Sequence, residues 1–256
     1  MSTNDLVANS DKTELLVCRP KKGKNNPTPL HINIGGYDVE ESTSIKLLGM
    51  HISNDLSWAE HVRQLEKHLH HILFTLRWVK SKISKTHLIR VAEGIFISRI
   101  MYGISIYCPI PKKENYAQNK ILKTLQNFQN KAMRVILGKK VSDKVRISDM
   151  LKECGWLSIN QMAIKTRLVE AWKAMNDNSS PLKDMFEFRR PISNIKTRSV
   201  SKNLLTLKTS KSMQSSNSFS RVVSQLWNEA PKEIREAKTL SSLKNRVNIL
   251  ARKYPI

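Results

Sequence analysis

The stretch from Leu47 to Lys80 constrains the fold more than any other part of the chain. Apolar residues recur in it at alternating steps of four and three, which places them on one face of a helix of about six turns. These apolar positions are Trp58, Val62, Leu65, Leu69, Ile72, Leu76 and Val79. Ser57 and Glu60 have the spacing of a capping box, in which each side chain satisfies a backbone N–H of the other residue. The pattern predicts a long amphipathic helix that buries one face.

Short apolar segments before this helix predict a small antiparallel sheet of three or four strands. The expected strands cover residues 13–18, 30–34, 37–39 and 45–52. Gly35 and Gly36 lie between two of these strands and predict a two-residue hairpin turn, because both turn positions need a positive φ. A sheet of this size needs a helix packed against it, and the helix that follows is the nearest candidate.

The rest of the chain predicts a helical bundle and a basic segment. The expected helices cover residues 84–107, 115–137, 147–154, 159–175, 219–227 and 240–251. Gly138 and Gly155 are placed as helix C-caps, and Ser158 with Gln161 forms a second capping-box pattern. Residues 188–228 contain no acidic residue and are rich in Ser and Asn, so we expect much of this segment to be irregular. The predicted fold class is therefore mainly α, with a small antiparallel sheet, a helical bundle and a basic C-terminal segment.

The net charge is strongly positive and unevenly distributed. The 256 residues include 44 Lys and Arg against 21 Asp and Glu, a net charge of +23. Residues 1–110 carry 14 basic and 10 acidic side chains, whereas residues 111–256 carry 30 and 11. A field of this sign attracts polyanions, and nucleic acid is the commonest such partner. An acidic membrane surface is the rival partner, but neither terminus carries the strongly basic amphipathic helix that would support it.

The cysteines and the apolar segments bear on the cellular compartment. Cys18, Cys108 and Cys154 are odd in number and far apart, which fits neither a disulfide framework nor a zinc site. The first residues lack the apolar run of a signal peptide. The most apolar stretch, residues 88–110, is interrupted by three charged residues and makes a poor membrane span. We therefore expect a cytoplasmic or nuclear protein with no membrane partner.

Segments spread over the chain share their pattern with one protein family. They are Ser10–Leu15 (SDKTEL), Phe96–Tyr107 (FISRIMYGISIY), Leu125–Gly138 (LQNFQNKAMRVILG), Leu151–Leu168 (LKECGWLSINQMAIKTRL) and Ser218–Val247. These segments resemble the reverse transcriptases of non-LTR (LINE-type, jockey-like) retrotransposons, RNA-directed DNA polymerases. Leu47, Leu48 and Gly49, followed by "LSW", resemble the family's primer grip, with Leu47 in the place of its usual aromatic residue. The resemblance implies four parts: residues 1–56 as the end of the palm, 57–176 as the helical thumb, 177–217 as a basic linker and 218–256 as a C-terminal helical segment.

The sequence lacks the acidic pair on which catalysis in that family depends. The resemblance implies paired aspartates on a hairpin that hold two Mg²⁺ ions, but the sequence contains no Asp-Asp pair, and Asp5 and Asp11 are isolated. Without the metals the main electrostatic stabilisation of phosphoryl transfer is absent. We therefore expect this chain to be inactive alone, with no cofactor of its own and Mg²⁺ needed only by the complete polymerase. Lys12 aligns with a family position proposed to protonate the departing pyrophosphate, a role that needs the missing upstream polymerase segment.

Basic residues are the better functional candidates. Contacts from Lys and Arg to phosphates give affinity for RNA or an RNA–DNA hybrid without sequence specificity. The first group of candidates lies on the exposed side of the predicted thumb helix and at its end, and the second begins the acid-free segment. The candidates are Lys120, Lys123, Lys131, Arg134, Lys139 and Lys140, and then Arg189, Arg190 and Arg198. The predicted function is backbone-type binding of a template–primer duplex or of element RNA.

Two other classes of function remain as alternatives. The first is a stand-alone helical interaction protein, or a non-functional remnant, without specific nucleic-acid binding. The second is a metal nuclease built on histidines; His61 and His68 lie seven residues apart, but no Cys or carboxylate of suitable spacing joins them, so we expect no metal site. Trp156, Trp172 and Trp227 each lie in an apolar pattern and are expected to pack in the core rather than stack on bases.

Overall fold

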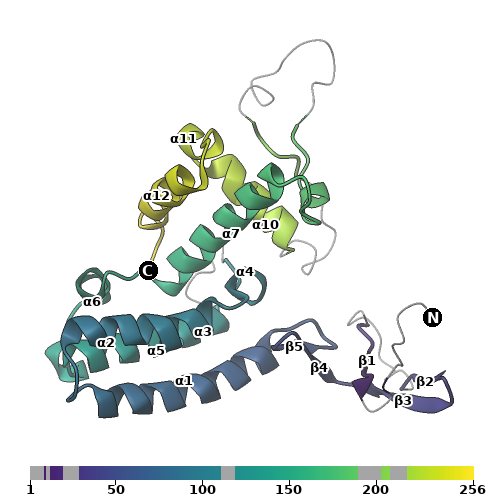
Figure 1. Cartoon of the computed structure of the whole chain (residues 1–256), viewed down its shortest axis with the longest axis horizontal. Helices are drawn as coiled ribbons and strands as arrows, with labels where there is room; N and C mark the ends of the chain where they lie inside the picture. The colour runs from purple at the N-terminus through teal and green to yellow at the C-terminus, as the bar shows by residue number, and fades with distance from the viewer. Residues whose placement is uncertain (1–8, 10–11, 20–28, 111–118, 190–202, 208–217) are drawn as a thin grey trace, which may run out of the picture. The chain divides into compact units, whose positions relative to one another are not determined.

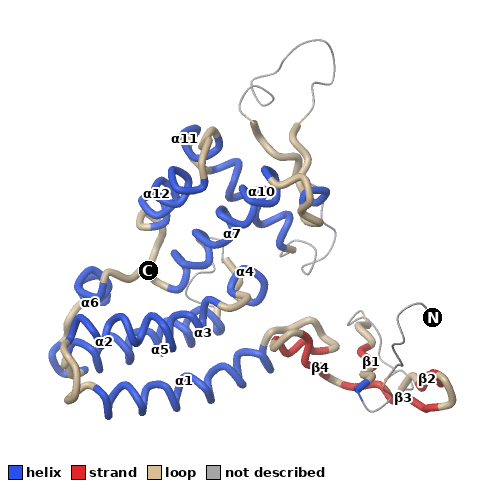
Figure 2. The backbone as a smooth tube through the Cα atoms, in the orientation of Figure 1, coloured by secondary structure: helices blue, strands red, loops and turns tan. Residues whose placement is uncertain are grey.

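The computed structural model describes residues 9, 12–19, 29–110, 119–189, 203–207 and 218–256 (Figure 1). The chain divides into two compact units, Met1–His68 and Leu69–Ile256. The described residues are mainly helical with a small antiparallel sheet, as the sequence predicted. The named strands lie in the first unit, whereas helices make up most of the second (Figure 2).

The first unit contains a three-stranded sheet. Its strands are β1 (Leu15–Leu16), β2 (His31–Ile34) and β3 (Tyr37–Ser42), in the order β1-β3-β2. The hairpin predicted at Gly35 and Gly36 is confirmed, because β2 and β3 pair antiparallel and both glycines have positive φ values of 61° and 89°. Contrary to the prediction, β1 runs parallel to β3. The Arg19 guanidinium binds the Glu41 carboxylate on β3, and this contact ties the chain after β1 to the sheet.

The strand predicted over residues 45–52 is wrong, because the chain turns back within it. It forms two antiparallel strands, β4 (Ser44–Leu47) and β5 (Met50–Ser53), which make a separate hairpin. Leu48 and Gly49 are the turn, with φ values of 47° and 82°. Two successive positive φ values match the right-handed twist of a tight hairpin, and Leu48 adopts one despite its side chain. The Leu-Gly step is therefore a turn and not the end of a strand.

The long helix α1 (Ala59–Val79) confirms the predicted stripe and corrects its start. Val62, Leu65, Leu69 and Leu76 are buried as predicted, and Leu73 joins them. The capping box of Ser57 and Glu60 is not formed. The Ser57 N–H donates to Asp55 Oδ1 over 2.9 Å, and the Glu60 carboxylate accepts from the side chains one turn further along the helix.

The second unit contains the end of α1 and the remaining helices. They are α2 (Lys85–Ala92), a turn of π-helix (Glu93–Ile97), α3 (Ser98–Met101), α4 (Ile104–Tyr107), α5 (Lys120–Leu137), α6 (Ile147–Cys154), α7 (Ile159–Asn176), α10 (Phe219–Glu229), α11 (Lys232–Arg235) and α12 (Leu240–Ala251). Short 3-10 turns cover Val141–Asp143 and Lys183–Met185. The helix predicted over 84–107 is interrupted by the π-helical turn, which contains Gly94, and at Gly103, whose φ is 68°.

Short sequence motifs predicted several helix ends correctly. Gly138 and Gly155 are the C-caps of α5 and α6 with φ values of 68° and 72°. The capping box of Ser158 and Gln161 opens α7, where the Ser158 N–H donates to Gln161 Oε1 and the Gln161 N–H donates to Ser158 Oγ. These ends depend on residues within one helical turn, which is why the sequence predicts them.

A core formed by α7, α10 and α12 crosses one of the expected divisions of the chain. Buried residues from all three helices pack together there, among them Ile164, Leu168, Val223, Trp227 and Val247. The expected boundary at residue 176 lies between α7 and α10, and the three helices belong to one unit. Within the acid-free segment, residues 203–207 are held to this core, because Asn228 bonds to both backbone groups of Leu205. Most of the rest of that segment lies outside the described residues.

Candidate nucleic-acid interface

Helix α5 carries the first group of predicted phosphate-binding residues. Asn119 caps its N-terminus by accepting the Leu122 N–H over 3.0 Å, and Gly138 ends it. One face is buried, with Leu122, Leu125, Phe128, Ala132, Met133 and Ile136. The eighteen residues of the helix contain no Asp or Glu. The opposite face therefore has no negative charge of its own.

The basic residues of α5 share that exposed face. Lys120, Lys123 and Lys131 are exposed, and Arg134 is half-buried. They follow one another at steps of three, eight and three residues, so they form one row along the helix over about 21 Å, at about 1.5 Å per residue. We call these four residues the α5 basic face. Like charges three or four residues apart weaken a helix slightly, so this row does not stabilise α5.

Aromatic contacts position one lysine of the α5 basic face. The Lys131 Nζ lies 5.2 Å from the centre of the Phe128 ring, within the range of a cation–π interaction. The edge of the same ring meets His70 of α1, with ring centres 4.8 Å apart. Phe128 thus joins α5 to α1 and holds the ammonium group of Lys131 beside their junction.

The end of α1 runs parallel to α5 and adds a further cation. His70 of α1 contacts Phe128 of α5, and ten residues later in both segments Lys80 approaches Gly138. A Cβ atom added to Gly138 would lie 3.4 Å from Lys80 Nζ. Lys139 and Lys140 follow Gly138 and are exposed. Lys139 and Lys140, which were predicted, and Lys80, which was not, therefore lie near the C-terminal end of α5. The last carbonyl groups of the helix carry partial negative charge there.

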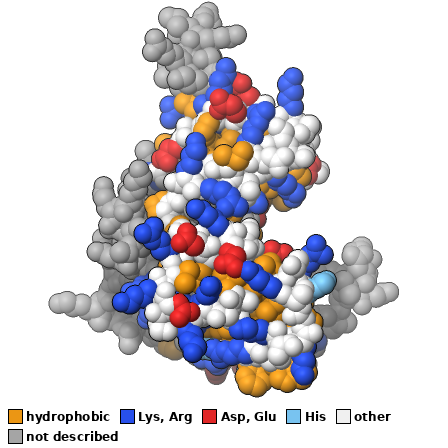
Figure 3. All heavy atoms as spheres, turned by 90° about the vertical axis from the view of Figure 1, so that its left-hand side faces the viewer, with side chains coloured by type: hydrophobic (Ala, Val, Ile, Leu, Met, Phe, Trp, Pro, Cys, Tyr) orange, Lys and Arg blue, Asp and Glu red, His pale blue; other side chains and the backbone are white. Residues whose placement is uncertain are grey.

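Two carboxylates near this end already have partners. Asp143 Oδ2 accepts the backbone N–H of Lys140 over 2.7 Å. Glu153 of α6 forms an ion pair with Lys85 of α2. The hydrogen bond from Lys85 holds the pKa of Glu153 below its ordinary value, and the charges of Lys85 and Lys139 act in the same direction. On the face of the molecule that Figure 3 shows, Lys and Arg side chains are more widespread than Asp and Glu side chains.

Of the second group of predicted basic residues, the structure describes only Arg189. Arg189 is half-buried, and its Nε donates to the Leu205 carbonyl over 3.3 Å, next to a bridge between Phe188 and Leu205. Its contacts hold residues 203–207 in place, which is a structural role. Arg190 and Arg198 lie outside the described residues.

The predicted primer-grip residues and Lys12 belong to the first unit. Leu47 and Leu48 lie at the tip of the β4–β5 hairpin, where Leu48 is 83% exposed, and Gly49 completes the turn. Lys12 is exposed in a short turn, and its backbone N–H donates to the Asn9 carbonyl. Asp5 and Asp11 lie outside the described residues.

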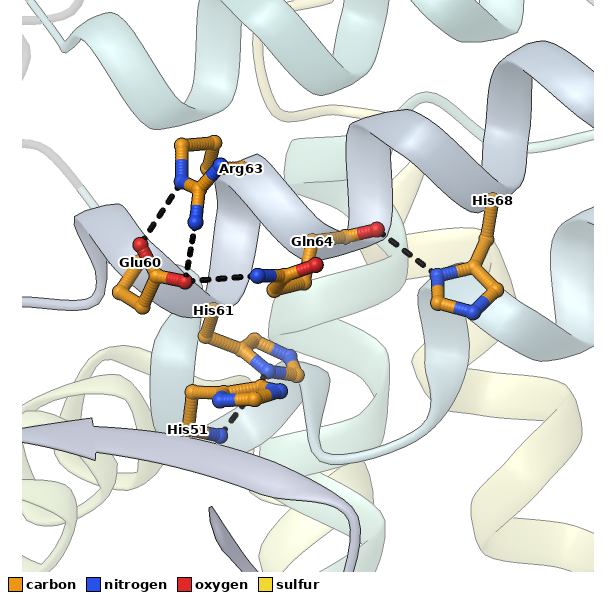
Figure 4. A network of polar contacts seen from close by, with 6 residues as sticks. All are labelled: His51, Glu60, His61, Arg63, Gln64 and His68. Atoms are coloured by element: carbon orange, nitrogen blue, oxygen red, sulfur yellow. Dashed lines mark hydrogen bonds and ion pairs between the residues drawn. The ribbon is translucent and has the colours of Figure 1, made fainter. Parts of the chain in front are cut away.

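The two histidines considered as metal ligands, His61 and His68, both lie on α1. His61 is buried, and its Nδ1 accepts the backbone N–H of His51 over 3.4 Å (Figure 4). Burial lowers the pKa of His61, and the neighbouring His51 adds to the effect. His68 lies further along α1, with its Nδ1 2.8 Å from the Gln64 carbonyl. Among the residues that the structure describes, no three His, Cys, Asp or Glu side chains are placed to hold a metal ion.

The tryptophans predicted for the core are placed there, and two exposed aromatic residues were missed. Trp156 and Trp227 are buried, and Trp172 packs against the same core as Trp227. Phe74 and Trp78 of α1 are instead 71% and 67% exposed. They lie one turn apart on the helix and outside the predicted apolar stripe. An aromatic pair at this spacing, off the buried face, is the sequence signal that identifies them.

Comparisons with protein-family models, with curated proteins and with solved structures found no match to this chain. No helix within the described ranges is long and apolar enough to cross a membrane.

Proposed function

We propose that this chain is the C-terminal part of a non-LTR retrotransposon reverse transcriptase, and that it holds a template–primer duplex or element RNA by the sugar–phosphate backbone. The segments listed above, from SDKTEL to the C-terminal helices, support the family. The observation that carries the binding function is the α5 basic face, a row of four cations on a helix without a single acid.

The α5 basic face suits a nucleic-acid backbone. Its cations are spread over about 21 Å, and duplex DNA presents one phosphate charge per about 1.7 Å of its axis. Each Lys or Arg that neutralises a phosphate releases counterions, so the affinity depends on salt and not on sequence. Lys80, Lys139 and Lys140 extend the positive surface beyond the end of the helix.

Phe74 and Trp78 add a second kind of contact. They lie on the end of α1 that runs beside α5, and both rings are mostly exposed. Exposed aromatic rings favour unpaired bases, because every base has a face on which a ring can stack. This arrangement supports single-stranded element RNA, or a template overhang, as part of the ligand.

Polymerisation is not proposed for this chain alone. Its sequence has no Asp-Asp pair, and the described acidic residues form no group that could hold two metal ions. The residues present therefore do not fit the two-Mg²⁺ centre that the family uses. An upstream polymerase segment is the partner that would complete the active site.

The test is the affinity of the full chain for a fluorescently labelled RNA–DNA hybrid at one salt concentration. The variant Lys123→Gln with Lys131→Gln removes two charges from the α5 basic face. The matched control, Lys152→Gln with Lys238→Gln, removes two exposed lysines elsewhere in the same unit. We expect the first pair to weaken binding about tenfold and the control to change it little. Equal losses in both would mean that only net charge matters and would overturn the proposal.

A second candidate function rests on Phe74 and Trp78. Large exposed aromatic side chains are typical anchors of protein interfaces. In that case Phe74→Ala with Trp78→Ala would abolish binding to a protein partner at high salt, where contacts to phosphates are screened. Hybrid binding that is unaffected by the same variant would favour this second function for α1.

A further inference from the structure

A pocket on the second unit shares no residue with the α5 basic face. It has a volume of about 560 Å³, within the range of about 300–1,000 Å³ that is usual for small-molecule sites. Three helical faces and one loop line it, each helix contributing residues at steps of three or four. They are Glu93, Ile97 and Met101; Gly155, Trp156 and Leu157; Met162, Lys165, Thr166, Val169, Glu170 and Lys173; and Lys244, Asn248 and Arg252.

Three of the lining cations converge across two helices. Lys165 of α7 donates from Nζ to Asn248 Oδ1 of α12 over 3.2 Å. Lys244 and Arg252 lie one turn before and one turn after Asn248, on the same face of α12. Burial lowers the pKa of Lys165, and the positive charges of Lys244 and Arg252 lower it further. In the part of the chain that the structure describes, none of these three cations forms an ion pair.

Two carboxylates also line the pocket. Glu93 Oε1 accepts the Trp156 Nε1–H over 3.0 Å. The charge of Glu170 acts on Arg167 of its own helix. Four basic and two acidic side chains line the pocket, so it keeps a net positive charge. Because Lys244 and Arg252 repel the charge of Lys165, an anion bound among the three cations would lower their free energy.

Five apolar side chains also line the pocket. Ile97, Met101, Leu157, Met162 and Val169 all border the same space. The turn that supplies Glu93 and Ile97 is π-helical, a form that costs stability and is found frequently at functional sites. The pocket therefore combines a positive region with an apolar region, which matches a ligand that has an anionic end and an apolar body.

We propose that this pocket binds a phosphate monoester whose phosphate contacts Lys165, Lys244 and Arg252 and whose apolar or ring-shaped body packs against Ile97, Met101 and Val169. A phosphate monoester carries a charge of about −1.5 to −2 at pH 7 and has three strong acceptor oxygens, one for each cation. This site goes beyond the proposed function, because it shares no residue with the α5 basic face.

The test is calorimetric binding of adenosine monophosphate to the full chain, compared with adenosine and with inorganic phosphate. Adenosine monophosphate carries both the ring and the anion of the proposed ligand, adenosine carries only the ring, and inorganic phosphate carries only the anion. We expect adenosine monophosphate to bind at least about tenfold more tightly than either part. Octanoate, a carboxylate on an apolar chain, separates a phosphate site from a fatty-acid site. Tighter binding of octanoate would overturn the phosphate assignment.

Variants separate this site from general attraction to positive charge. Lys165→Gln with Arg252→Gln is expected to weaken adenosine monophosphate binding at least about tenfold. Lys123→Gln with Lys131→Gln removes the same charge from α5 and is expected to leave that affinity unchanged while it weakens hybrid binding. Lys244→Gln changes one exposed residue and serves as a second variant if the first does not fold. Unchanged binding in a folded pocket variant, or an equal loss in the α5 variant, would overturn the proposal.

Discussion

Gln129 offers a direct test of how α5 is fixed in the second unit. Its side chain is 0% exposed, and Nε2 donates to the Leu157 carbonyl over 2.7 Å. Its Oε1 accepts from Gln126, whose own Oε1 accepts the Ile159 N–H at the start of α7. Replacing Gln129 by Met keeps the volume roughly constant but removes both hydrogen bonds of Gln129 and leaves the Leu157 carbonyl without its donor.

The expected cost of Gln129→Met follows from these contacts. An unsatisfied buried carbonyl costs about 1–3 kcal/mol and the lost amide–amide bond about 1 kcal/mol, while the added apolar burial returns about 1 kcal/mol. We therefore expect a loss of about 1–3 kcal/mol in the free energy of unfolding. For a unit of this size the melting temperature would fall by about 2–12 °C.

The assay is thermal and chemical denaturation followed by tryptophan fluorescence. Four of the five tryptophans, all except Trp58, belong to the second unit, so the signal reports mainly on its unfolding. Asn127→Met is the matched control, since Asn127 is an exposed amide on the same helix and its replacement should change stability by less than about 0.5 kcal/mol. A Gln129→Met protein as stable as the control would refute the role of this network.

Three further predictions concern single residues. Gly49→Ala should destabilise the β4–β5 hairpin by about 1 kcal/mol in chemical denaturation, because the φ of Gly49 is 82°; an unchanged midpoint would contradict the turn. Burial raises the pKa of Cys108 to about 12 and that of Cys154 to about 11, so a thiol reagent at pH 8 should label only the exposed Cys18 until the protein unfolds. Hydrogen bonds from neighbouring arginine and glutamine side chains lower the pKa of Glu60 from 4.5 to about 2. Its stabilising contribution is therefore present above pH 4.5 and is lost as the pH falls toward 2, which a carboxyl NMR titration would follow and a midpoint near 4.5 would contradict.

The sequence predicted features that depend on neighbouring residues. The C-caps at Gly138 and Gly155 and the capping box at Ser158 follow from side chains within one turn. The α5 basic face was also predictable, because positions three and four residues apart on a helix share a face. Its basic residues were identified from spacing and charge alone.

Features set by competing or distant contacts were not predicted. Ser57 and Glu60 have the spacing of a capping box, but the carboxylate is taken by Arg63, which lies on the same exposed side of α1. Nothing in the sequence distinguishes Leu48 from a strand residue, although the hairpin gives it a positive φ. The pocket depends on Lys165 meeting Asn248, and residues so far apart are brought together only by packing.

The measurement that tests the central claim most directly is the salt dependence of RNA–DNA hybrid binding. Each neutralised phosphate contributes about 0.9 to the slope of log affinity against log salt concentration, so the four cations of the α5 basic face account for about 3.6. The account predicts that neutralising Lys120, Lys123, Lys131 and Arg134 together reduces the slope by about that amount in a folded protein. A flat salt response in the natural chain, or the same slope in the variant, would contradict it.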